Sequence, residues 1–237
     1  MPPNIRSSSE GFGQPVTLGH TGALQQRRVL RNTYLLLAIT MIPTTIGAFI
    51  GMSLNFGIIR SNPIIASLTI LALVYGMFFA IEKNKDSGLG VALLLGLTLF
   101  LGIILGPLLQ VALSLKNGAQ LVAMAAGGTA VVFFTMAGIG ATTKRNLSFM
   151  ASFLAVGIIV VMLAVVANIF FASPLLHLTI SGAFVVICSM LILFQVNQIV
   201  QGGETNYVSA TLTLYMSIYN LFSSLLHILM ALTGQRD

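Results

Sequence analysis

The hydrophobic positions of this chain fall into seven long runs separated by short polar breaks. A helix needs about 20 apolar residues to cross about 30 Å of hydrocarbon, and the runs have this length. They are too long and too continuous for the alternating strands of a membrane β-barrel. The pattern therefore predicts an all-α polytopic membrane protein, a bundle of seven transmembrane helices. The predicted helices cover residues 33–56, 63–81, 88–113, 119–141, 149–171, 177–200 and 207–232.

The polar residues outside these runs are few, and they define the predicted domain organisation. Residues 1–32 are polar and lack the early apolar region of a signal peptide, so we expect a flexible N-terminal tail. Residues 33–232 form the predicted seven-helix transmembrane domain, and residues 233–237 form a short C-terminal tail. Because the connections between runs are about 4–7 residues long, they leave no room for a second folded domain.

Composition supports a membrane protein, and the position of the charges predicts its orientation. Hydrophobic residues make up 57% of the chain and charged residues only 7%, against about a quarter in ordinary globular domains. The net charge of +6 comes from scattered lysines and arginines, which form no stripe for nucleic acid. A cytoplasmic N-terminus gathers eight of the eleven basic residues inside, as the positive-inside rule favours. Seven crossings then place the C-terminus in the periplasm, unless the last segment, which is comparatively polar, dips back or inserts only halfway.

No arrangement of residues in the sequence predicts catalysis, a cofactor or a metal site. The chain contains no H-E-x-x-H motif, no G-x-S-x-G motif and no phosphate-binding glycine loop. No carboxylate lies deep in a predicted span, and the single cysteine, Cys188, can form no disulfide within the chain. The histidines within the spans, His177 and His227, are expected near the membrane interfaces or packed in the bundle. The sequence therefore predicts a protein that is not an enzyme.

Small residues in the third predicted span indicate close helix packing. Gly102 and Gly106 form a small-xxx-small pair, which lets a second helix backbone approach. Pro107 follows directly and removes one helical hydrogen bond, so the sequence predicts a kink there. A packing seam is the first interpretation of these three residues, and a hinge is the alternative.

Polar residues in the last span fall on one helical face. Because polar groups avoid lipid, this stripe is expected to face inward, toward Cys188 and Gln195 on the sixth span, with Asn197 and Gln198 just beyond. Two interpretations remain open: hydrogen bonds between helices, worth about 0.6 kcal/mol each, or a solvated cavity or ion path. The stripe consists of Thr213, Ser217, Asn220, Ser224 and His227.

Extended similarity also links the chain to a known family. The segments that carry it are RVLRNTYLLL (28–37), ILGPLLQ (104–110), GGTAVVFF (127–134), VANIFF (166–171) and GGETNYVSATLTLYMSIYNLF (202–222). Over about residues 25–232 the chain resembles the Bax inhibitor-1 family of seven-helix membrane proteins, and within it the bacterial YccA-like branch. The resemblance implies a protein of the bacterial inner membrane that binds the membrane-bound AAA protease complex FtsH and restrains its degradation of membrane proteins.

The same family suggests an alternative function, a calcium or cation leak. Members studied as calcium leak proteins carry two aspartates, one in each of the last two helices, as a pH-sensitive latch. The resemblance places Gln195 and Ser217 at these two positions, and neither side chain titrates near neutral pH. The alternative is therefore a calcium or cation path along Gln195, Ser217 and Asn220 that lacks the aspartate switch.

Overall fold

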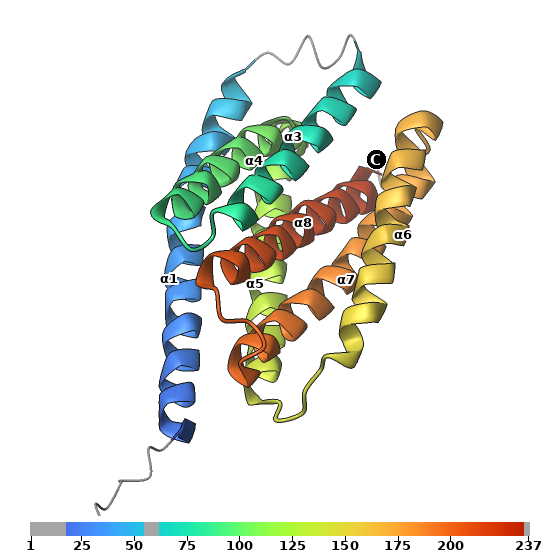
Figure 1. The fold of residues 1–237 in the computed structure, drawn as a ribbon. Helices are drawn as coiled ribbons and strands as arrows, with labels where there is room; N and C mark the ends of the chain where they lie inside the picture. The colour runs from blue at the N-terminus through green and yellow to red at the C-terminus, as the bar shows by residue number, and fades with distance from the viewer. Residues whose placement is uncertain (1–17, 55–61, 235–237) are drawn as a thin grey trace, which may run out of the picture.

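A computed structural model describes residues 18–54 and 62–234, and within these ranges the chain forms seven helices and no strand (Figure 1). All seven helices are long and apolar enough to cross a membrane, which confirms the predicted all-α, seven-helix architecture. The helices are α1 (Leu18–Ser53), α3 (Pro63–Lys83), α4 (Gly88–Ser114), α5 (Gly118–Thr142), α6 (Phe149–Phe171), α7 (Pro174–Gln201) and α8 (Tyr207–Gly234).

The first helix begins earlier than the apolar pattern predicts. It starts at Leu18 rather than residue 33, so residues 18–32 are helical and do not belong to a flexible tail. Residues 1–17 of the predicted tail lie outside the described residues. The extension is held by packing, because Val29 is buried in a small cluster with Ile199 and Ala210. Residues 18–32 are thus helical despite their polar composition.

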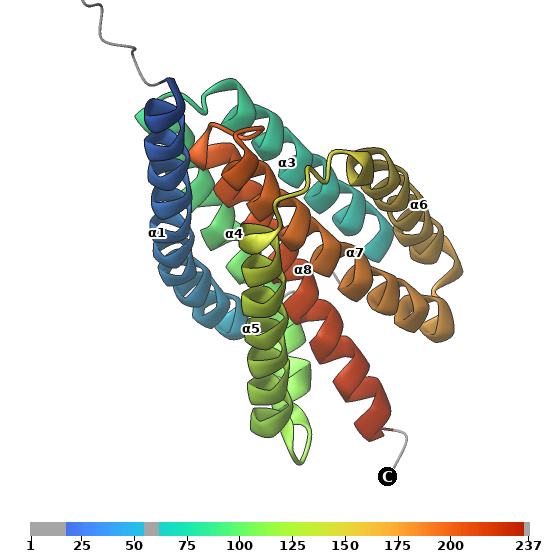
Figure 2. The same ribbon diagram turned by 90° about the horizontal axis from the view of Figure 1, so that it is seen from below.

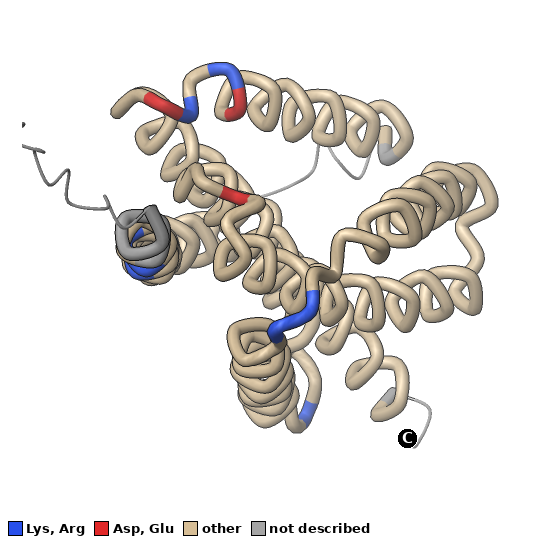
Figure 3. The backbone as a smooth tube through the Cα atoms, turned by 60° about the horizontal axis from the view of Figure 1, so that its bottom comes forward, with Lys and Arg blue, Asp and Glu red and all other residues tan. Residues whose placement is uncertain are grey.

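The charged side chains gather at one end of the bundle. The first turns of α1 and the α3–α4, α5–α6 and α7–α8 connections lie together there (Figures 1 and 2). Figure 3 turns this end, here called the charged end, toward the viewer. Among the described residues it carries seven basic and three acidic side chains, and the opposite end carries only Lys116. The charged residues at this end are Arg27, Arg28, Arg31, Glu82, Lys83, Lys85, Asp86, Lys144, Arg145 and Glu204.

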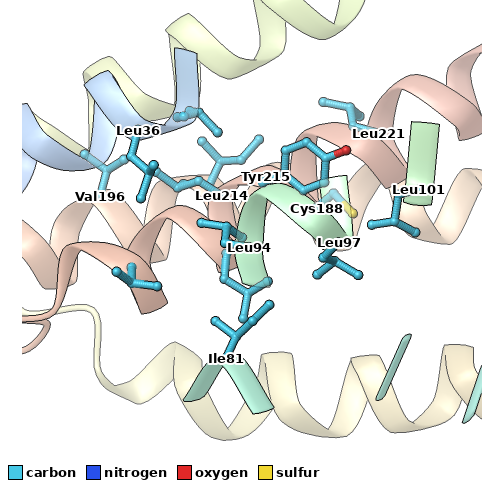
Figure 4. Packing of buried hydrophobic residues seen from close by; sticks show 14 of the residues in the cluster. Leu36, Ile81, Leu94, Leu97, Leu101, Cys188, Val196, Leu214, Tyr215 and Leu221 are labelled. Atoms are coloured by element: carbon cyan, nitrogen blue, oxygen red, sulfur yellow. The ribbon is translucent and has the colours of Figure 1, made fainter. Parts of the chain in front are cut away.

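The main hydrophobic core lies around α8, which packs against α1, α4, α5 and α7 (Figure 4). Tyr215 of α8 is one of its largest fully buried residues, with 1% of its surface exposed. Its hydroxyl oxygen lies 2.8 Å from Thr44 Oγ1 of α1 and donates to the Thr98 carbonyl oxygen of α4 at 3.4 Å. One tyrosine thus joins three helices that are distant in the sequence.

Helices α1 and α4 pack with their backbones in contact, and the glycines of both make this approach possible. A Cβ atom added at Gly102 would lie 3.0 Å from Thr44 Cα, and one at Gly106 would lie 2.6 Å from the Met52 nitrogen. On the α1 side, Gly47 and Gly51 are equally crowded by α4. Real Cβ atoms do not approach other backbones so closely, so a side chain at any of these positions would force the two helices apart.

The helix α4 continues through Pro107 as one element, from Gly88 to Ser114. Proline has no N–H, so the Ile103 carbonyl oxygen one turn earlier loses its helical donor. That oxygen faces Gly51 of α1, within the α1–α4 seam. Gln110 Nε2, one turn beyond the proline, donates to the Met52 carbonyl oxygen of the same helix. The structure thus places Gly102 and Gly106 in the packing interface with α1, and Pro107 follows Gly106 directly.

Candidate functional site

Two adjoining cavities lie between α3, α6, α7 and α8, and together they are here called the α8 cleft. Their volumes are about 480 and 450 Å³, and residues such as Phe184 and Asn220 line both. Figure 1 shows α3 and α6 on either side of α8. These two helices contact each other only slightly, so they leave the cleft between them.

The polar stripe of α8 lines this cleft along its whole length. Thr213 and Ser217 border the first cavity, Ser224 and His227 the second, and Asn220 both. Where side chains of the stripe form hydrogen bonds, their partners are carbonyl oxygens of α8 itself. Asn220 Nδ2, for example, donates to the Met216 carbonyl oxygen at 2.9 Å. Ser217 Oγ likewise donates to the Thr213 carbonyl oxygen at 2.8 Å. Among the described residues, this stripe forms no hydrogen bond to α7, so the geometry supports a cavity rather than bonds between helices.

The chemistry of the cleft is set by neutral groups. Its walls are mainly apolar, with large side chains such as Tyr75, Phe78 and Ile187 around the first cavity. The described carboxylates lie at the charged end and none lines the cleft. The cleft therefore offers amides, hydroxyls, two imidazoles and the buried Cys188 thiol, but no carboxylate to hold a hard cation.

Gln195, the other residue that the family resemblance singles out, does not line the cleft. It is buried, with 7% of its surface exposed, and its Nε2 has no hydrogen-bond partner in the described structure. Ser217 is also buried but borders the cleft together with Asn220. The structure thus brings Ser217 and Asn220 to one cavity and leaves Gln195 outside it.

The amides that follow Gln195 bind the α5–α6 connection, a role that the sequence pattern did not predict. Asn197 is fully buried, and its Nδ2 lies 3.0 Å from the Thr143 carbonyl oxygen and 3.2 Å from that of Arg145. Its Oδ1 accepts the Leu147 backbone N–H at 3.2 Å. The sequence pattern placed the amides after Gln195 beside α8. Helical geometry instead turns Asn197 about 200° away from Gln195, toward α5. No motif in the sequence signals this contact.

Asn206 performs a similar role for the last helix and the α3–α4 connection. Its Oδ1 accepts the backbone N–H of Val208 at 2.8 Å, which caps the first turn of α8. Its Nδ2 donates to Asp86 Oδ1 at 2.8 Å and to the Lys85 carbonyl oxygen at 3.2 Å. An asparagine directly before an apolar run is an N-cap signal, so this cap was accessible from the sequence. In the same connection, a hydrogen bond from Lys85 Nζ to Glu82 at 3.2 Å raises the pKa of Lys85.

Comparison with a protein-family model decides the family. The model described as inhibitor of apoptosis-promoting Bax1 matches residues 26–234, which include all the helices from α3 to α8 and most of α1. The chain belongs to the Bax inhibitor-1 family. This membership confirms the resemblance drawn from the sequence.

Bacterial members of the Bax inhibitor-1 family are similar to this chain over most of its length. A protein of Escherichia coli K12 named modulator of FtsH protease YccA is 42% identical over 209 residues, which cover 88% of this chain and 92% of the relative. An uncharacterized protein of Neisseria meningitidis serogroup A is 42% identical, covering 90% of this chain and 94% of the relative. A Pseudomonas aeruginosa protein is 40% identical, covering 84% and 87%. Of these three names, that of the Escherichia coli relative describes a regulator of a protease.

Proposed function

We propose that this protein resides in the bacterial inner membrane, binds the FtsH protease complex and restrains its degradation of membrane proteins. The observation that carries the proposal is the 42% identity with the FtsH modulator of Escherichia coli, which covers 92% of that relative. The similarity extends over nearly the whole bundle, so most positions of the relative have an aligned counterpart in this chain.

Two features of the fold support a role beside an unfolding protease. The α1–α4 seam joins two backbones through glycines, and the buried Tyr215 hydroxyl ties α8 to both helices. Tightly packed elements open with free energies near that of global unfolding, so a segment held in this way resists extraction from the membrane. Such a protein can occupy the protease without being degraded.

The experiment expresses this chain in an Escherichia coli strain that lacks the relative. We expect FtsH subunits to co-purify with the chain from detergent-solubilised membranes, and we expect membrane substrates of FtsH to be degraded more slowly. A matched control carries Gly102→Leu, which should disrupt the α1–α4 seam and abolish both effects, whereas Gly127→Ala should preserve them. The proposal fails if no FtsH co-purifies and substrate half-lives do not change.

A second candidate function, a calcium or cation leak, is favoured by one observation. Ser217 and Asn220 line a cavity of about 480 Å³, and polar groups inside a membrane bundle commonly mark ion pathways. Reconstituted liposomes containing only this protein would then leak calcium, and Ser217→Leu would reduce the flux. Flux that equals that of protein-free liposomes, or that is unaffected by Ser217→Leu, would exclude this path.

A further inference from the structure

Two histidines meet in the α8 cleft, at the end away from the charged end. His177 lies in the first turn of α7 and His227 in the last turns of α8. Their ring centroids are 4.6 Å apart, with the ring planes at 77°. Both border the second cavity, together with the hydroxyl-bearing Ser181 and Ser224 and with Asn220. Neither proposed function uses this pair.

The hydrogen bond of His227 decides which of its ring nitrogens is available to bind a ligand. Its Nδ1 lies 2.7 Å from the Ser223 carbonyl oxygen. Because a carbonyl oxygen can only accept, Nδ1 carries the proton and Nε2 keeps its lone pair. Histidines that bind metals typically donate their other ring N–H to a carbonyl in this way. His177 is exposed, and no hydrogen bond restrains its ring within the described part of the chain, so that ring can turn toward a shared ligand.

The two rings lie close to the separation that a shared metal ion requires. Two imidazoles bound to one tetrahedral Zn²⁺ at about 2.1 Å have ring centroids roughly 5 Å apart. The observed 4.6 Å is an edge-to-face ring contact, so both rings must turn and move slightly apart to admit an ion. Calcium and magnesium prefer several carboxylate oxygens, which the cleft does not provide. Imidazole nitrogen favours zinc, copper and nickel.

We propose that His177 and His227 bind one divalent transition-metal ion of the class that prefers imidazole, such as Zn²⁺ or Cu²⁺. Among the described residues, no third histidine, cysteine or carboxylate joins the pair, so water and the neighbouring oxygens of the cleft complete the coordination. Ser224 supplies one such oxygen, three residues before His227 on the same face of α8. The bound ion joins the start of α7 to the end of α8. It thereby fixes this end of the cleft.

The first test is calorimetric titration of the full chain in detergent, purified without a polyhistidine tag. We expect one Zn²⁺ per chain and no binding of Ca²⁺. His177→Ala and His227→Gln should each weaken Zn²⁺ binding at least tenfold. The third histidine of the chain provides the matched control, since His20→Ala should bind as tightly as the wild type. Absence of saturable Zn²⁺ binding, or binding that survives either cleft variant, overturns the proposal.

A second measurement does not depend on the folding of any variant. The wild-type protein loaded with one equivalent of Cu²⁺ should show electron paramagnetic resonance couplings from two imidazole nitrogens. Wild-type spectra that show no coupling, or coupling from only one imidazole nitrogen, would contradict the site. Heating wild-type protein with and without Zn²⁺ adds a third result: a bound ion that joins α7 to α8 raises the midpoint of unfolding. An unchanged midpoint at saturating Zn²⁺ would contradict the cross-link.

Discussion

Replacement of Asn197 tests whether the α5–α6 connection is held by a single buried amide. In Asn197→Leu, the side chain keeps a similar volume but loses its hydrogen bonds to the Thr143 and Arg145 carbonyl oxygens and to the Leu147 N–H. Each such bond contributes about 1 kcal/mol net to stability. The two N–H groups of the Asn197 amide and its oxygen form three hydrogen bonds at a time. Loss of all three would therefore lower the free energy of unfolding by about 3 kcal/mol.

Access of water to the connection reduces this estimate. Arg145 is exposed and Thr143 is half-buried, so water can replace part of what their carbonyl oxygens lose. We therefore expect Asn197→Leu to lower the free energy of unfolding by about 2 kcal/mol. In a chain of this size, this corresponds to a midpoint roughly 4–8 °C lower. Asn197→Asp should cost at least as much, because it turns a carboxylate oxygen toward two carbonyl oxygens.

The chain carries its own reporter for this measurement. Cys188 is its single cysteine and only 2% exposed, so a thiol-reactive fluorescent maleimide labels it when the bundle unfolds. Gln201→Ala is the matched control, since this exposed residue on the same helix gives a single hydrogen bond to Thr143 at 3.1 Å. Its midpoint should fall by less than about 2 °C. Equal midpoints for Asn197→Leu and Gln201→Ala would refute the assigned role of Asn197.

Three further predictions concern the seam, the core and the last helix. Gly102→Ala should lower the unfolding midpoint in the same dye assay by roughly 3 °C or more, because its Cβ would lie 2.9 Å from the Thr44 carbonyl carbon. Gly127→Ala is the control: its Cβ would have no atom within 4 Å, so the midpoint should stay the same or rise. Tyr215→Phe removes the 2.8 Å contact with Thr44 and should cost about 1 kcal/mol, seen as a midpoint a few degrees lower; an unchanged midpoint would mean that the hydroxyl is dispensable. Asn206→Ala removes the N-terminal cap of α8, which should cost about 1 kcal/mol. Hydrogen exchange in the first turn of α8, measured by mass spectrometry, should therefore become about fivefold faster; an unchanged rate would show that the cap is not needed.

The lengths of the apolar runs were sufficient to predict the helices. Apart from the start of α1, each predicted boundary lies within three residues of the structure, because a span must match the membrane thickness. The start of α1 was missed because residues 18–32 form a helix beyond the apolar run, where hydropathy gives no signal. The polar stripe of α8 was also visible, since only polar residues distinguish an inward face when the outward face meets lipid.

The pairing of helices was not accessible in this way. Gly102 and Gly106 predict the close approach of another helix, but nothing in the sequence identifies Gly47 and Gly51 of α1 as their partners. In a soluble protein, the contrast between apolar and polar faces would narrow the choice, whereas here both faces are apolar. The role of Asn197 was missed for a related reason, because its position in the sequence indicates a polar contact but not its partner.

The seam between α1 and α4 also has a consequence for how the protein is made. Helix α3 is synthesised between them, yet it packs on α4 and makes no contact with α1 among the described residues. During synthesis, the face of α1 that carries Gly47 and Gly51 therefore has no packing partner until α4 has been made. The half-buried hydroxyl of Thr44 gains its partner later still, since Tyr215 belongs to the last helix. Assembly of this bundle is thus completed only when translation is nearly over.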